Sequence, residues 1–152
     1  MRRSGGAGKP FIVLAAEFHP GLARALVRGA ADTLRRQGIP SRRVRVVWVP
    51  GAFELPVVAA RLARRRPKPG AIIALGVLLR GETSQYEVIA HAVAQGLSQV
   101  SVTTGVPVTF GVIVASTLAQ ARARAGGSMG NRGTEAALAA LAVLRLLDAH
   151  HA

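Results

Sequence analysis

Three short clusters of polar and aromatic residues are the places in this sequence where chemistry could occur. Each directly follows an apolar run, and their sequences are Glu17-Phe18-His19, Gly51-Ala52-Phe53-Glu54 and Gly81-Glu82-Thr83-Ser84-Gln85. The ring of Phe18 can stack on a planar ligand, and the carboxylate of Glu54 can accept hydrogen bonds from hydroxyl groups. Glu82-Thr83 is predicted to open a helix, whose first backbone amides suit an anion.

Each of these residues alone has a simpler structural explanation. An aromatic side chain after a strand usually belongs to the packing, and Thr83 is an ordinary helix-capping residue. The case for a site therefore depends on whether the fold brings the three clusters together.

Four apolar runs predict strands, at residues 11–16, 44–49, 71–79 and 107–115. The first predicted helix carries Leu22, Leu26, Ala30 and Leu34 at helical spacing and ends at Gly38. Further helices are expected at residues 55–66, through 86–100, at 117–125 and at 135–148. Apolar strands that alternate with helices favour a four-stranded parallel sheet with helices on both faces, a single-domain three-layer α/β/α sandwich. In such a sheet the three clusters share the edge formed by the strands' carboxyl ends.

Length and composition limit the alternatives. The chain has 152 residues, 50% of them hydrophobic, which suits one domain over residues 11–149 behind a flexible, basic tail at residues 1–10. The apolar run at residues 11–16 is too short for a signal peptide or a membrane span, so a cytoplasmic protein without membrane attachment is expected. Because cysteine is absent, disulfides, thiolate nucleophiles and cysteine-bound zinc are excluded.

The net charge of +13 comes mainly from arginine and suits nucleic acid, anionic substrates or an acidic partner. The arginines fall at predicted element ends, and aromatic residues make up only 4% of the chain. This pattern favours solvated faces over a nucleic-acid surface, which stays open as the alternative. The last predicted helix is apolar around most of its circumference, which indicates association between subunits.

Four segments, at residues 49–56, 75–83, 107–112 and 130–137, together resemble the 6,7-dimethyl-8-ribityllumazine synthase family. The resemblance extends over residues 11–147. It implies a flavodoxin-like fold, assembly into pentamers and the penultimate reaction of riboflavin synthesis. That reaction condenses 5-amino-6-(D-ribitylamino)uracil with 3,4-dihydroxy-2-butanone 4-phosphate, without metal or organic cofactor, and releases water and phosphate.

The resemblance also implies roles for individual residues. Phe18 would stack on the pyrimidine ring, residues 52–54 would hold the ring and ribityl chain, and Glu82 and Thr83 would bind phosphate. Phe110 and Arg124 would come from the adjacent subunit, and Arg132 stands where lysine is usual. The implied substrate-binding set is Phe18, Ala52, Phe53, Glu54, Leu78, Leu79, Glu82, Thr83, Phe110, Arg124 and Arg132.

The resemblance extends to assemblies of pentamers, decamers or shells of sixty subunits. Since the turn at residues 126–133 has no insertion, a shell is favoured. Such a shell could associate with riboflavin synthase or retain an anionic cargo on its arginines.

Gln85 departs from the family pattern, which has a histidine there that moves protons. A carboxamide forms hydrogen bonds but has no useful acid-base equilibrium. One acid-base group contributes about 10²–10⁴-fold, whereas holding the two reactants together contributes roughly 7–11 kcal/mol. A slowed synthase is therefore predicted, with His19, and after it Glu87, as candidate substitutes. His91 is expected to be structural or exposed, and His150 and His151 are expected to belong to a tail. The alternatives are a weakened paralogue that binds lumazine or flavin, or holds cargo in a shell, and a cationic container for nucleic acid or acidic protein.

Overall fold

The sheet contains four parallel strands in the order β2-β1-β3-β4, as expected from the sequence. The computed structural model describes residues 8–150, so most of the predicted basic tail and His151 lie outside the described residues. The strands are β1 (Phe11–Ala16), β2 (Val44–Val49), β3 (Ala71–Leu79) and β4 (Val108–Ala115). A short antiparallel hairpin, β5 (Ala125–Gly127) and β6 (Gly130–Asn131), follows α4.

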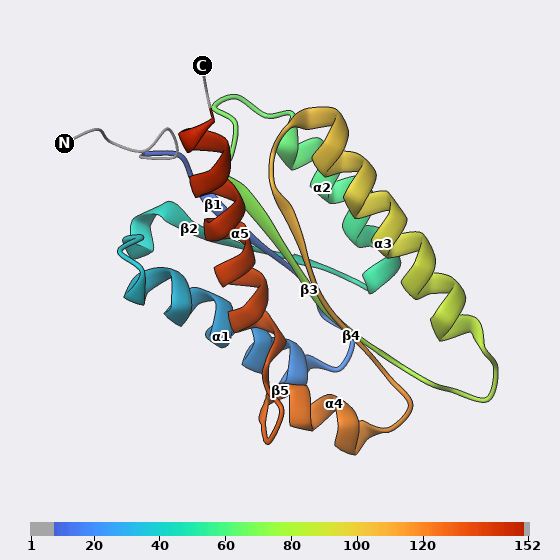
Figure 1. Cartoon of the computed structure of the whole chain (residues 1–152). Helices are drawn as coiled ribbons and strands as arrows, with labels where there is room; N and C mark the ends of the chain where they lie inside the picture. Colours follow the sequence, from blue (N-terminus) through green and yellow to red (C-terminus); the bar gives the residue numbers. More distant parts are fainter. Residues whose placement is uncertain (1–7, 151–152) are drawn as a thin grey trace.

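Helices cover both faces of the sheet (Figure 1). One face carries α1 (Pro20–Arg36) and α5 (Arg132–Ala149), and the other carries α2 (Leu55–Ala63) and α3 (Gln85–Thr104). The short α4 (Leu118–Arg124) follows β4, and two 3-10 turns, η1 (Ser41–Arg43) and η2 (Ala52–Glu54), flank β2. The three-layer α/β sandwich predicted from the sequence is confirmed.

Two hydrophobic cores lie on opposite faces of the sheet, and successive residues of a strand contribute their side chains alternately to one and the other. Val13 and Ala15 of β1 pack with α1 and α5, whereas Ile12, Leu14 and Ala16 pack with α2 and α3. All six residues of β1 are buried, and so are the first seven of β3. Two buried faces explain why these strands read as unbroken apolar runs.

Helix ends differ from the sequence predictions by one to three residues at several places. The second helix ends at Ala63 rather than at residue 66, because Pro67 and Pro69 restrict the backbone of the residues before them. The last helix begins at Arg132 rather than at residue 135, because the Asn131 side chain caps it. The third begins only at Gln85, so Glu82 and Thr83 lie in the turn before it rather than opening it.

Asn131 joins the start of α5 to α1. Its Oδ1 accepts hydrogen bonds from the amides of Gly133 at 2.8 Å and Thr134 at 3.1 Å, and its Nδ2 donates to the Ala25 carbonyl at 3.1 Å. Gly133 permits this close approach, since a Cβ atom there would collide with the backbone of Leu26. One side chain therefore fixes both the first turn of α5 and its position against α1.

No helix within residues 8–150 is both long and apolar enough to cross a bilayer.

Replacing Asn131 with alanine is expected to lower the free energy of unfolding by about 1–3 kcal/mol, because both the helix cap and the link to Ala25 are lost. Asn131→Ser retains a cap but cannot reach the Ala25 carbonyl, so its loss should be smaller. Thermal unfolding at fixed protein concentration measures both variants. Parent-like stability in Asn131→Ala would contradict this role.

Candidate active site

A cavity of about 410 Å³ opens at the carboxyl ends of the strands. All three residue clusters predicted from the sequence contribute to its wall. The cavity is lined by Phe18, Gly51, Ala52, Phe53, Glu54, Val77, Leu78, Leu79, Gly81, Thr83, Gln85, Tyr86 and Ile89. Its volume falls within the range of about 300–1,000 Å³ that is usual for small-molecule sites.

Two aromatic rings stand at this cavity with large exposed areas. Phe18 follows β1 and is 67% exposed, and Phe53 follows β2 within η2 and is 63% exposed. Exposed phenylalanine is costly in water, and at a cavity it offers a flat surface for a ring. Glu54, half-buried beside Phe53, adds a hydrogen-bond acceptor to the same wall.

His19 lies beside this cavity but does not line it. It occupies the position before α1 in a left-handed conformation, with φ of 60°. Its ring meets that of Phe18 edge to face, with the centroids 4.8 Å apart and the planes at 81°. This geometry makes His19 a support for the Phe18 ring.

The part of the cavity wall that best suits an anion is the start of α3. Thr83 and Gln85 both line the cavity, and the backbone N–H of Gln85 donates a hydrogen bond to Thr83 Oγ1 at 3.4 Å. Ser84 holds the capping position but makes no capping hydrogen bond with its side chain. The first-turn amides of a 20-residue helix carry partial positive charge, which suits a phosphate group. Glu82 is exposed and does not line the cavity.

Tyr86 is the polar cavity residue that the sequence analysis missed as a site residue. It begins the helix predicted through residues 86–100, and it is half-buried on the cavity wall. Its hydroxyl donates a hydrogen bond to Glu87 Oε1 at 3.2 Å. A phenol that is hydrogen-bonded to a carboxylate therefore lies directly after Gln85. The position of Tyr86 next to Gln85 in the sequence was the signal that could have predicted it as a site residue.

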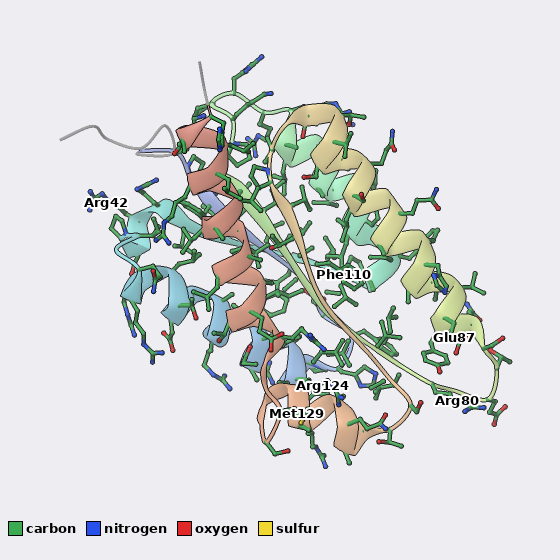
Figure 2. All side chains as sticks on the ribbon, viewed as in Figure 1. Arg42, Arg80, Glu87, Phe110, Arg124 and Met129 are labelled. Atoms are coloured by element: carbon green, nitrogen blue, oxygen red, sulfur yellow. The ribbon has the colours of Figure 1, made fainter. Side chains whose placement is uncertain are left out.

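The other predicted residues do not line the cavity of the same chain. Figure 2 shows Phe110 beside the middle of the sheet and Arg124 beside α4. Phe110 pairs with Ala74 in the middle of the sheet, whereas Leu79 at the cavity pairs with Ala115. The five residue steps between these β4 positions span roughly 16 Å of extended strand. Phe110 is nevertheless 42% exposed, on an edge strand.

Two predicted cationic residues are also outside this wall. Arg124 ends α4, and its Nη1 donates to the Gln120 carbonyl at 3.2 Å. Arg132 pairs with Glu135 at 3.0 Å. One chain thus brings the aromatic side chains, Glu54 and the start of α3 to one cavity. Neither Phe110 nor these two arginines line the cavity of their own chain.

Within the part of the chain that the structure describes, no group of three or more His, Cys, Asp or Glu side chains could hold a metal ion.

The chain is similar to proteins of one family along nearly all its length. The model of the family described as 6,7-dimethyl-8-ribityllumazine synthase matches residues 8–148. Three curated proteins with that name cover most of both chains. The protein from Gemmatimonas aurantiaca is 43% identical over 94% of this chain and 87% of its own. That from Desulfotalea psychrophila is 42% identical over 93% and 91%, and that from Leuconostoc mesenteroides subsp. mesenteroides is 37% identical over 92% and 89%.

Proposed function

The chain belongs to the 6,7-dimethyl-8-ribityllumazine synthase family, and we propose that it catalyses the lumazine-forming condensation of riboflavin biosynthesis. The substrates are 5-amino-6-(D-ribitylamino)uracil and 3,4-dihydroxy-2-butanone 4-phosphate, and water and phosphate leave. The observation that carries this proposal is the single cavity into which Phe18, Glu54 and the start of α3 all face.

Each of the two substrates occupies a different part of this cavity. Phe18 stacks on the pyrimidine ring, and Glu54 together with the backbone of Ala52 and Phe53 binds the ribityl hydroxyls. The butanone phosphate lies between Leu78, Leu79 and the start of α3, where Thr83 and the helix amides bind its phosphate. The amine and the ketone are then held side by side, which supplies most of the rate enhancement.

A second subunit completes the site with Phe110 and Arg124, and Arg132 adds a further positive charge nearby. Support comes from apolar side chains that one subunit leaves exposed. Val102 of α3 is 80% exposed, and Leu146 and Leu147 of α5 are 60% and 51% exposed. Soluble monomers rarely expose so many large apolar groups, so we propose a homopentamer, with a shell as the larger assembly.

The chemistry requires proton transfers that Gln85 cannot perform. A bond forms between the amine nitrogen and the ketone carbon, both protons of the amine pass to the former carbonyl oxygen, and that oxygen departs as water and leaves a carbon–nitrogen double bond. Gln85 lines the cavity and can orient the hydroxyl of the intermediate through its carboxamide. Catalysis through proximity persists, while the contribution of a positioned acid-base group, about 10²–10⁴-fold, is reduced.

The Tyr86–Glu87 pair is better placed than His19 to move the remaining protons. Tyr86 lines the cavity next to Gln85, and its hydroxyl is hydrogen-bonded to Glu87. A proton taken from the amine can reach Glu87 through the Tyr86 hydroxyl and return to the departing oxygen. His19 instead packs on Phe18 and affects binding of the ring.

Replacing Gln85 with histidine is expected to raise kcat by about 10-fold or more, because imidazole restores a proton carrier. KM should change little, since the binding residues are untouched. Formation of lumazine from the two substrates, followed by absorbance, measures the effect, and Gln85→Leu is the matched control that removes the polar group. Absence of turnover in correctly assembled parent and in Gln85→His would contradict the synthase proposal and favour a ligand-binding protein.

Tyr86→Phe and Glu87→Gln are each expected to lower kcat by about 10-fold while KM is retained, since only proton transfer is impaired. In a Gln85→His background the same changes should cost much less, because histidine takes over the transfer. His19→Ala serves as the comparison and should raise KM rather than lower kcat. Equal losses of kcat with and without histidine at position 85 would show that the pair is merely structural.

Phe18→Ala and Arg124→Ala should each be severely impaired alone and should complement each other in mixed oligomers. If neighbouring subunits share a site, assemblies refolded from equal amounts of both variants regain about a quarter of the parent activity, from interfaces that pair two intact halves. Each variant refolded alone is the control. Failure of the mixture to exceed these controls would contradict a shared site.

A further inference from the structure

Exposed arginines gather at the end of the sheet opposite the cavity. Arg42 and Arg45 flank the start of β2, and Arg64, Arg65 and Arg66 lie between α2 and the start of β3. Since the strands are parallel, their amino ends meet at one edge of the sheet. We call these five exposed residues the amino-end arginine patch.

Hydrogen bonds tie the segments of this patch together. Arg43 donates from Nε to the Lys9 carbonyl at 3.1 Å, and its guanidinium lies over the Phe11 ring, 5.6 Å from the centroid. The Gly70 amide donates to the Pro10 carbonyl at 2.8 Å. The segments before β1, β2 and β3 are therefore side by side, and the arginines are displayed on a fixed framework.

Four of the seven acidic residues lie at the other end of the molecule, whereas Asp148 lies at the amino end, in a pocket that Lys9 and Lys68 also line. Glu17, Glu54, Glu82 and Glu87 all follow the carboxyl ends of strands. Figure 2 places Arg42 at the end opposite Glu87 and Arg80. Within residues 8–150 the two salt bridges pair Arg35 with Asp32 and Arg132 with Glu135, so neither neutralises a residue of the patch. The patch thus places five of the chain's 20 basic side chains at one end of the molecule.

The chemistry of this face suits phosphates in a polymer. Guanidinium groups bind phosphate oxygens through two parallel hydrogen bonds and remain charged at all physiological pH values. Five exposed arginines exceed what a single phosphomonoester needs, so a ligand that carries several phosphates suits them better. The large aromatic side chain among these segments, Phe11, is buried, so bases have no ring to stack on. Contacts to phosphates alone do not depend on base sequence.

We propose that the amino-end arginine patch binds the phosphate backbone of nucleic acid, without sequence preference and independently of the catalytic cavity. Each subunit of an oligomer carries one patch, so affinity increases through multivalent contact. Binding is electrostatic. It weakens steeply as the salt concentration rises, because the release of counterions from the nucleic acid then contributes less free energy. Because the cavity lies at the far end of the strands, bound nucleic acid leaves lumazine formation unaffected.

The test measures binding of a labelled mixed-sequence DNA duplex to nucleic-acid-free protein by fluorescence anisotropy over a range of NaCl concentrations. The triple variant R42Q/R65Q/R66Q is compared with R24Q/R28Q/R122Q, which removes the same charge from exposed arginines outside the patch. The patch variant should bind at least about 10-fold more weakly than the parent. The slope of log K against log salt should become less steep by about two to three, since each lost phosphate contact contributes about 0.9 to its magnitude. The control variant should stay within about twofold of the parent, and circular dichroism and particle size confirm that both fold and assemble.

Equal weakening in the two variants would overturn the proposal, because binding would then reflect net charge alone. Binding of polyglutamate as tightly as a duplex of equal charge would also overturn it and indicate an acidic protein partner. Lumazine formation is measured in the same samples. Unchanged turnover at saturating duplex is expected, and competition between the duplex and the phosphate substrate would place binding in the cavity and overturn the proposal.

Discussion

The two central strands determine the rest of this structure, because their peptide groups cannot reach water. β1 is buried along its whole length and β3 along most of it, between helical layers on both sides. Each amide and carbonyl must therefore find its partner in a neighbouring strand, and an unpaired group would cost roughly 1–3 kcal/mol. This requirement fixes the parallel registers, which in turn bring the ends of β1, β2 and β3 to one edge. The cavity follows from that alignment and not from any single loop.

The strand order adds a reason for the position of the cavity. β1 has β2 on one side and β3 on the other, so the segments after β1 and β3 lead to helices on opposite faces of the sheet. A crevice opens at such a switch point, where neighbouring loops diverge. Phe18 from the β1 end and Leu78 and Leu79 from the β3 end line it. The same geometry collects the segments that precede the strands at the opposite edge, where arginines accumulate without competing with the chemistry.

Position 85 shows how binding and proton transfer are separable in this site. Gln85 lies in the wall of a cavity that retains its aromatic faces, its carboxylate and the start of a long helix. These groups act by stacking, hydrogen bonding and partial charge, and none of them needs to titrate. In the proposed mechanism, proton transfer depends on one or two atoms at the reacting bond, so a glutamine at position 85 would impair it while substrate positioning persists. The phenol of Tyr86 and the carboxylate of Glu87 are the groups nearest in sequence that can exchange protons.

The sequence by itself determined the four strands, the alternation with helices, the three-layer sandwich and the resemblance that family comparison confirmed. It also predicted that three residue clusters share one edge of the sheet, since apolar runs and strand ends are local signals, and eight of the predicted site residues line the cavity there. Only the tertiary structure decided which side chains face that cavity. A left-handed turn directs His19 onto Phe18, and Tyr86 meets the cavity rather than the core. Asn131 starts α5 three residues before the predicted position by accepting bonds from the amides of Gly133 and Thr134, and it also bonds to α1. Each of these outcomes depends on a contact between segments far apart in the chain or on one backbone angle, and neither leaves a periodic pattern in the sequence.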